Sequence, residues 1–189
     1  MRKELSAKPD SSLNVIRCGD ISAEKLEKKL LKLQKKGFVF INPKDLEKTD
    51  LPPRPALLTF AEGYESFYKN IFPLLAELKI PALVFVTVSA IGSCDFWNED
   101  GLWHNILSAA QIKELKKSGL VDFGSAGLTG KTPPTAQEIE ESAHRLKTLH
   151  KINPLYFCFC AAEEAGRQDI FDAAKKSFRF LFTPDGKLP

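Results

Sequence analysis

A few residues of this sequence have side chains suited to hydrolytic or metal chemistry, at positions that a fold can bring together. Glu62 follows an apolar run, and a carboxylate there can act as a general base or as a metal ligand. His104 lies in an irregular segment, and Cys160 ends another apolar run. A carboxylate, an imidazole and a thiolate are an allowed ligand set for a transition metal. Because the spacing does not require such a site, a metal centre built from Glu62, His104 and Cys160 is only an alternative.

Aromatic side chains lie near the same positions. Tyr64 closely follows the apolar run at residues 56–60, whereas Trp97 and Trp103 lie in the irregular segment of residues 89–107. A loop of this length in a small domain is usually functional. Aromatic rings at such places can stack on a ligand, although they more often serve packing.

The cysteines and the acidic pairs have simpler interpretations. Cys158 and Cys160 are two residues apart on an expected strand, so their side chains point to one face. We expect both thiols to pack as small apolar groups, with a soft-metal or redox pair as the alternative. The pairs Glu99–Asp100 and Glu163–Glu164 are expected to be solvated surface charges, although either pair can line the rim of a ligand site.

Length and composition exclude several classes of protein. The chain has 189 residues, 43% hydrophobic and 27% charged, with a net charge of +3. This length suits a single domain over residues 1–189. No apolar run is long enough to span a bilayer, and the small, dispersed charge does not favour nucleic acid. The basic start lacks the apolar stretch of a secretory signal, so the chain is expected to be cytoplasmic as it stands, or exported if a signal segment was removed.

Apolar runs alternate with amphipathic segments along the chain. Strands are predicted at residues 13–16, 38–41, 56–60, 82–88, 120–123, 155–160 and 178–183. Helices are predicted after Ser22, over residues 66–78 with a kink at Pro73, after the capping boxes that begin at Ser108 and Thr135, and over residues 169–176.

This alternation predicts an α/β fold. Nearly continuous apolar strands between helices indicate a parallel sheet, here of about seven strands. The order favours a distorted β/α barrel, complete or incomplete, and leaves an open doubly wound sheet as the alternative. An amino-terminal arm of strand, helix and strand at residues 1–50 precedes the barrel core at residues 55–189.

In a β/α barrel the chemistry lies at the carboxyl ends of the strands, and there the sequence resembles a known family. The run Thr59-Phe60-Ala61-Glu62-Gly63-Tyr64 is similar to the T-F-D-D-G-Y motif of the polysaccharide deacetylases (carbohydrate esterase family 4, the NodB homology domain). Residues 72–86 and 107–125 resemble the following scaffold segments of that family. Residues 13–45 resemble the amino-terminal arm of its poly-N-acetylglucosamine deacetylases. The resemblance implies a distorted β/α barrel and, as the family activity, metal-dependent N-deacetylation of polysaccharides.

The reacting groups of the family are not carried over with this scaffold. Ala61 lies where the family has its general base, Glu62 where it has a metal-binding Asp, and its two histidine ligands align with Ala126 and Gly130. A catalytic zinc site normally takes three protein ligands, so one carboxylate does not hold the metal tightly. The resemblance therefore implies a degenerate member with no metal expected, although the family uses a divalent ion such as zinc. Because the replacements are small, we expect a void or a larger pocket at the old ligand cluster.

These observations lead to three hypotheses of different classes. A chain that keeps its fold and loses its reacting groups is expected to be inactive and to bind a glycan, N-acetylated in this family, or a protein partner in a regulatory role. The first alternative is an active hydrolase on the carbon–nitrogen bond of N-acetyl groups, with Glu62 as base or ligand. The second is a scaffold subunit of a larger assembly. The candidate ligand-binding residues are Glu62, Tyr64, Trp97, Trp103, His104 and Cys160.

Overall fold

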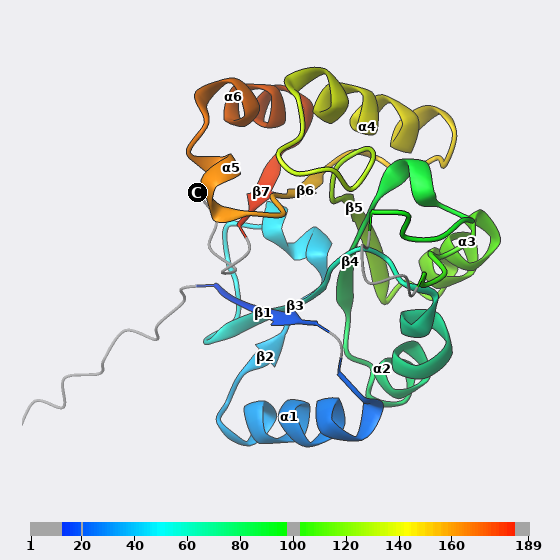
Figure 1. The fold of residues 1–189 in the computed structure, drawn as a ribbon. Helices are drawn as coiled ribbons and strands as arrows, with labels where there is room; N and C mark the ends of the chain where they lie inside the picture. The colour runs from blue at the N-terminus through cyan, green and yellow to red at the C-terminus, as the bar shows by residue number, and fades with distance from the viewer. Residues whose placement is uncertain (1–12, 20, 98–102, 184–189) are drawn as a thin grey trace, which may run out of the picture.

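The computed structural model describes residues 13–19, 21–97 and 103–183, which form a curled sheet with helices along its outer side (Figure 1). The strands are β1 (Asn14–Cys18), β2 (Val39–Phe40), β3 (Pro55–Phe60), β4 (Ala82–Val86), β5 (Val121–Ser125), β6 (Tyr156–Cys158) and β7 (Phe180–Phe182). The α-helices are α1 (Ala23–Lys35), α2 (Phe72–Leu78), α3 (Ala109–Lys117), α4 (Ala136–Thr148), α5 (Ala162–Ala165) and α6 (Gln168–Ser177). Three helical turns of other types are η1 (Pro43–Glu47), η2 (Phe67–Ile71) and η3 (Val88–Ala90).

The strand pairings confirm the predicted parallel α/β sheet. The order is β1-β3-β4-β5-β6-β7, with β2 paired to the start of β3, and all of these pairings are parallel. Among the described residues no pairing joins β1 to β7, so the sheet curls without closing. The barrel is therefore of the incomplete kind.

The packing of the two faces distinguishes this barrel from a doubly wound sheet. Leu58, Val84 and Phe123 belong to the larger core cluster, which also contains the apolar sides of α1, α3, α4 and α6. The opposite, concave face is filled by side chains of the strands and of residues that follow them, and among the described residues no buried member of this cluster comes from an α-helix. A doubly wound sheet has helices on both faces. The buried members of the concave cluster are Ile41, Leu57, Leu83, Phe85, Ala126, Tyr156, Cys158 and Phe182.

Most helix boundaries follow from local sequence signals. Both predicted capping boxes are present: Ser108 Oγ accepts from the Gln111 N–H at 3.3 Å, and Thr135 Oγ1 accepts from the Glu138 N–H at 3.2 Å. The segment at residues 66–78 differs from its prediction, because a π-helical turn, η2, precedes α2 instead of a kinked α-helix. Pro73 has no N–H to donate, and its ring crowds the carbonyl one turn earlier, which favours this wider turn.

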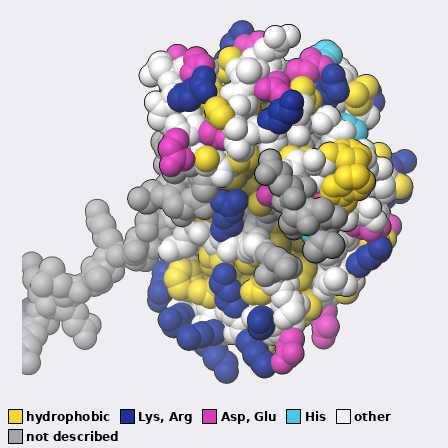
Figure 2. Space-filling model, viewed as in Figure 1, with side chains coloured by type: hydrophobic (Ala, Val, Ile, Leu, Met, Phe, Trp, Pro, Cys, Tyr) yellow, Lys and Arg dark blue, Asp and Glu magenta, His cyan; other side chains and the backbone are white. Residues whose placement is uncertain are grey.

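The molecule shows one strongly basic edge. Figure 2 shows Lys and Arg side chains gathered along α1, at the lower edge of the view. The apolar side of this helix, with Leu26 and Leu30, is fully buried against the sheet, so its lysines form the solvated side of an amphipathic helix. Within the described residues, no helix is long and apolar enough to cross a membrane.

Candidate functional site

The carboxyl ends of several strands converge at one end of the curled sheet, which we call the barrel mouth. Ala61 and Glu62 follow β3, Ala126 follows β5, and Cys160 lies just beyond β6. The Cys160 thiol donates to the Ala126 carbonyl oxygen, with 3.4 Å between sulfur and oxygen. The positions that the motif resemblance pairs with the family's reacting residues are therefore brought to the same region of the molecule.

A tight turn directs Glu62 and Tyr64 away from the end of β3. Glu62 has a φ of 66°, in the left-handed region that non-glycine residues rarely adopt, and Gly63 has a φ of 70°. A Cβ added to Gly63 would lie 2.5 Å from Val86 Cγ1. The backbone at Gly63 therefore packs directly against β4, and this close approach holds the turn in place.

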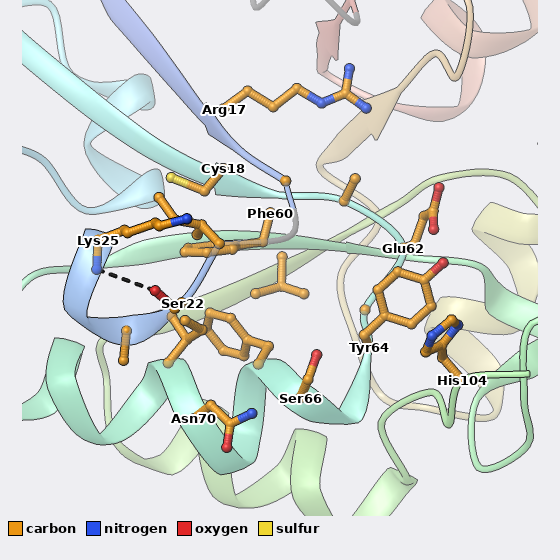
Figure 3. Close-up of a pocket in the computed structure, with 18 residues that line it drawn as sticks. Arg17, Cys18, Ser22, Lys25, Phe60, Glu62, Tyr64, Ser66, Asn70 and His104 are labelled. Carbon is orange, nitrogen blue, oxygen red and sulfur yellow. Dashed lines mark hydrogen bonds between the residues drawn. The ribbon is translucent and has the colours of Figure 1, made fainter. Parts of the chain in front are cut away.

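A cavity of about 890 Å³ lies beside this turn (Figure 3), between the end of β1, the start of α1 and η2. This volume is in the range of small-molecule sites, roughly 300–1,000 Å³. Its apolar lining is formed by Ile21, Phe60, Phe67, Ile71 and Val84. Its polar side chains are those of Arg17, Ser22, Lys25, Glu62, Tyr64, Ser66, Asn70 and His104.

Four of the residues at the barrel mouth form a connected polar network. Desolvation, together with the neighbouring Glu62 and Asp95 carboxylates, raises the pKa of Tyr64 well above its ordinary value, so the phenol stays protonated. Asp95 is fully buried and accepts from the His104 backbone N–H at 2.5 Å. A second Asp95 oxygen lies 3.1 Å from His104 Nδ1, and the rings of Tyr64 and His104 are 5.6 Å apart.

This network determines what His104 can offer to a ligand. When the imidazole is neutral, a carboxylate beside Nδ1 favours the tautomer that carries the proton on Nδ1, which leaves Nε2 as an acceptor. The His104 side chain is 55% exposed and lines the cavity, whereas Asp95 is buried behind it. Glu62 and the neutral ring of His104 can therefore accept hydrogen bonds from a ligand, and Tyr64 lies beside carboxylates. This arrangement is suited to binding the N–H and O–H groups of a ligand.

Sequence reasoning missed the role of Asp95. The residue lies in the irregular segment nine positions before His104, a spacing that matches neither helix nor strand periodicity. Two isolated antiparallel bridges, Cys94 with Asn105 and Tyr64 with Ile106, fold this segment back on itself and onto the turn after β3. Only this folded arrangement brings Asp95 to His104.

The residues at the old ligand positions do not fit a metal of the family type. Ala126 and Gly130 have no donor side chain, and a Cβ on Gly130 would lie 2.4 Å from Trp97 Cδ2. The expectation of a void is therefore wrong at Gly130, because the indole of Trp97 occupies that space. In the described part of the chain, no group of three or more His, Cys, Asp or Glu side chains could hold a metal ion. The alternative centre of Glu62, His104 and Cys160 is thus not formed.

The two cysteines near the mouth have unreactive thiols. Desolvation raises the pKa of Cys158 to about 11 and that of Cys160 to about 12, and the nearby Glu164 carboxylate adds to both shifts. A thiolate is the nucleophilic and metal-binding form, so neither group is activated at neutral pH. Cys158 is buried in the concave cluster, in agreement with its apolar interpretation, whereas Cys160 is exposed as a residue.

One member of the acidic pairs differs from its prediction. Glu164 is only 2% exposed instead of solvated, and its Oε2 accepts from the Cys160 N–H at 2.9 Å. This hydrogen bond secures the turn after β6, whereas Oε1 of the same carboxylate is buried without a hydrogen-bond partner among the described residues. Glu163 is exposed as expected, and Glu99 and Asp100 lie outside the described residues.

The remaining candidate residues divide into two places. Glu62, Tyr64 and His104 line the large cavity together, and Trp97 and Cys160 do not. Trp97 packs on Gly130, whereas Trp103 is 65% exposed and makes an edge-to-face contact with Phe96 at 5.6 Å. The structure therefore brings Glu62, Tyr64 and His104 to one cavity and places the two tryptophans in different surroundings, and a role of these residues in ligand binding stays a prediction.

The curled parallel sheet and its converging strand ends define the class of deacetylase-type β/α barrels. Residues 48–177 match the family model described as polysaccharide deacetylase, and the chain belongs to this family, which confirms the resemblance. A poly-beta-1,6-N-acetyl-D-glucosamine N-deacetylase of Staphylococcus epidermidis is 37% identical over 79 residues, 42% of this chain and 26% of that protein. One from Staphylococcus aureus is 28% identical over 117 residues, 60% of this chain and 39% of that protein. The chain thus matches less than half of the length of these relatives.

Solved structures share the fold over most of both chains. IcaB from Ammonifex degensii superposes with a TM-score of 0.75 at 22% identity, covering 92% of this chain and 86% of that one. A de-N-acetylase from Aggregatibacter actinomycetemcomitans gives 0.74 at 17% identity, covering 90% and 87%. These similarities establish the common barrel.

Proposed function

We propose that this chain binds an N-acetylated glycan at the barrel mouth without hydrolysing it. The observation that carries the proposal is a cavity of about 890 Å³ that keeps Glu62, Tyr64 and His104 in its lining, next to an alanine at the position of the family's general base. This combination supports binding without hydrolysis, because a lined cavity lies beside a residue that has no group able to accept a proton.

Amide hydrolysis requires an activated water, a polarised carbonyl and a proton for the leaving amine. Ala61 has no group that can take a proton from water, and loss of a general base costs about 10²–10⁴-fold in rate. Trp97 excludes a ligand side chain at Gly130, so the metal that would polarise the carbonyl has no complete set of donors there. Both deficits act on the same step of the reaction.

The lining of the cavity suits an acetamido sugar. Phe60, Ile71 and Val84 offer an apolar wall to an acetyl methyl group, while the Glu62 carboxylate can accept from an amide N–H. His104 Nε2 can accept from a ring hydroxyl. The names of the two staphylococcal relatives support N-acetylglucosamine as the sugar to test first.

A second candidate is a hydrolase with an altered site, in which Glu62 acts as the base. Its support is that the Glu62 carboxylate lines the same cavity as Tyr64, so a carboxylate is present at the mouth that could act as a base. Both candidates require a glycan in the same cavity and differ only in whether acetate is released.

One experiment separates them. N-acetylglucosamine oligomers are titrated into the protein by calorimetry, and acetate is measured with and without added zinc or cobalt, for the parent, Glu62→Gln and the exposed control Glu163→Gln. We expect binding that Glu62→Gln weakens and Glu163→Gln does not, with acetate no higher than in the metal-only blank. Acetate release that needs metal and disappears in Glu62→Gln would establish the hydrolase instead. Absence of binding would refute both.

A further inference from the structure

Helix α1 differs in charge from the rest of the chain. Residues 23–36 contain six lysines and two glutamates, so this segment has four net positive charges, whereas the whole chain has a net charge of +3. The helices α4 and α6 carry acidic and basic residues in nearly equal number. The small net charge of the chain therefore results from a strongly basic helix and a slightly acidic remainder.

The lysines lie along the exposed side of α1. An α-helix has 3.6 residues per turn, so positions 28, 32 and 35 follow one another on the same side. Lys28, Lys32 and Lys35 are all exposed, and we call these three residues the lysine row. Figure 2 shows the basic side chains of α1 along the lower edge of the molecule. The helix begins beside the large cavity, whose lining includes Lys25, and the row runs from there away from the barrel mouth.

Most of these charges are not neutralised by neighbouring acids. Lys28 pairs with Glu24 at 2.7 Å, and within the part of the chain that the structure describes no other lysine of residues 23–36 forms an ion pair. Like charges four positions apart on a helix repel each other and destabilise it. Lys32 has a lysine four positions away in both directions, at 28 and 36. A bound polyanion would relieve this repulsion, so the row is complementary to a ligand with several negative charges.

The composition of α1 indicates which polyanion suits it. Residues 23–36 contain no arginine and no aromatic residue, the side chains that form paired hydrogen bonds with nucleic-acid phosphates and stack on bases. A helix that binds a membrane surface inserts its apolar side among the lipids. The apolar side of α1 is instead buried against the sheet, and of its leucines only Leu31 is exposed. Lysine is a compact point charge that can pair with a carboxylate in many orientations.

We propose that the lysine row of α1 binds an anionic polysaccharide, with the three ammonium groups against acidic groups along the polymer. This surface is separate from the barrel mouth, because none of the three lysines lines the cavity there. The inference therefore goes beyond the proposed function and does not depend on it.

The test uses fluorescein-labelled polygalacturonate, a linear polysaccharide with one carboxylate on each sugar. Fluorescence anisotropy measures its affinity for the parent, for the α1 variant Lys28→Gln, Lys32→Gln, Lys35→Gln, and for a control variant. The control, Lys113→Gln, Lys117→Gln, Lys147→Gln, changes three exposed lysines of α3 and α4 and gives the same net charge.

The expected result is a loss of binding in the α1 variant alone. An exposed ion pair contributes about two- to fivefold to affinity, so the loss of three should weaken binding roughly 10- to 100-fold. The control variant should stay within about twofold of the parent. Raising the ionic strength from about 0.01 M to about 0.1 M shortens the Debye length from about 30 Å to about 10 Å and should weaken binding by the parent.

Several outcomes would overturn the proposal. An equal loss in the two triple variants would show that net charge alone determines binding, and equal binding of neutral dextran would show that charge does not. Absence of polygalacturonate binding would refute the row, and tighter binding of duplex DNA or of phosphatidylglycerol vesicles would refute the choice of ligand. Calorimetry with N-acetylglucosamine oligomers keeps the proposed function apart, because the α1 variant should bind them as the parent does.

Discussion

Asp95→Asn tests the polar network at the barrel mouth. The parent carboxylate is fully buried, accepts from the His104 backbone N–H at 2.5 Å, and contributes to the raised pKa of the neighbouring Tyr64. An asparagine keeps the shape and one acceptor oxygen, but its amide group is a donor that faces another donor. Hydrogen bonds to a charged group are worth about 1.5–3 kcal/mol each, and a buried mismatch costs about 1–3 kcal/mol. The contact with His104 Nδ1 adds little, because that side chain is 55% exposed.

We therefore expect Asp95→Asn to lower the free energy of unfolding by about 3 kcal/mol. Guanidinium unfolding at pH 7, followed by far-ultraviolet circular dichroism, measures this difference. Asp169→Asn is the matched control, because that carboxylate is exposed and, among the side chains that the structure describes, is paired with Arg167 alone, so it should leave the midpoint nearly unchanged. A loss below about 0.5 kcal/mol in Asp95→Asn, the range of ordinary surface substitutions, would refute the reasoning that this network holds the segment.

Two further predictions concern stability. Gly63→Ala should lower the free energy of unfolding more than Gly92→Ala does. Both glycines have positive φ, so an alanine at either position introduces about 1–2 kcal/mol of backbone strain. Only the Cβ at position 63 would meet Val86, which adds about 1–3 kcal/mol of overpacking. Equal midpoints for the two variants in denaturant would contradict this. Burial lowers the pKa of His150, so the unfolded state binds its proton more readily and stability should fall as the pH drops below the ordinary value of 6.5. In His150→Gln the decline between pH 7 and 5 should be smaller, whereas the exposed control His144→Gln should keep the parent's decline.

Much of the fold follows from local signals in the sequence. The capping residues Ser108 and Thr135 mark where α3 and α4 begin, since each satisfies a backbone N–H that the helix cannot. Apolar runs identify the strands, because a strand buried on both sides has no polar positions. The choice between barrel and doubly wound sheet does not follow in this way. It depends on whether helices or other strands cover the concave face, and strand hydrophobicity is the same in both cases.

The part of the candidate site that consists of residues close together in the chain could be predicted from the sequence. The resemblance at residues 59–64 located the end of β3, and with it Glu62 and Tyr64. The burial of Glu164 was not predictable, because its partner is a backbone N–H that only the turn after β6 presents. Trp97 was expected among the ligand-binding residues, and its position against Gly130 is a contact between segments 33 positions apart.

The sequence by itself determined the parallel α/β sheet and the family. It also determined the residue types at the positions that the motif resemblance pairs with the family's metal ligands. These are properties of hydrophobic pattern, motif and covalent structure, which do not depend on long-range contacts. Tertiary structure decided that Asp95 supports His104 and that Trp97 fills the space at Gly130. Each of these depends on how the irregular segment packs across the ends of the strands. Contacts between side chains that are far apart in the chain are set by that packing and are not encoded in any local pattern.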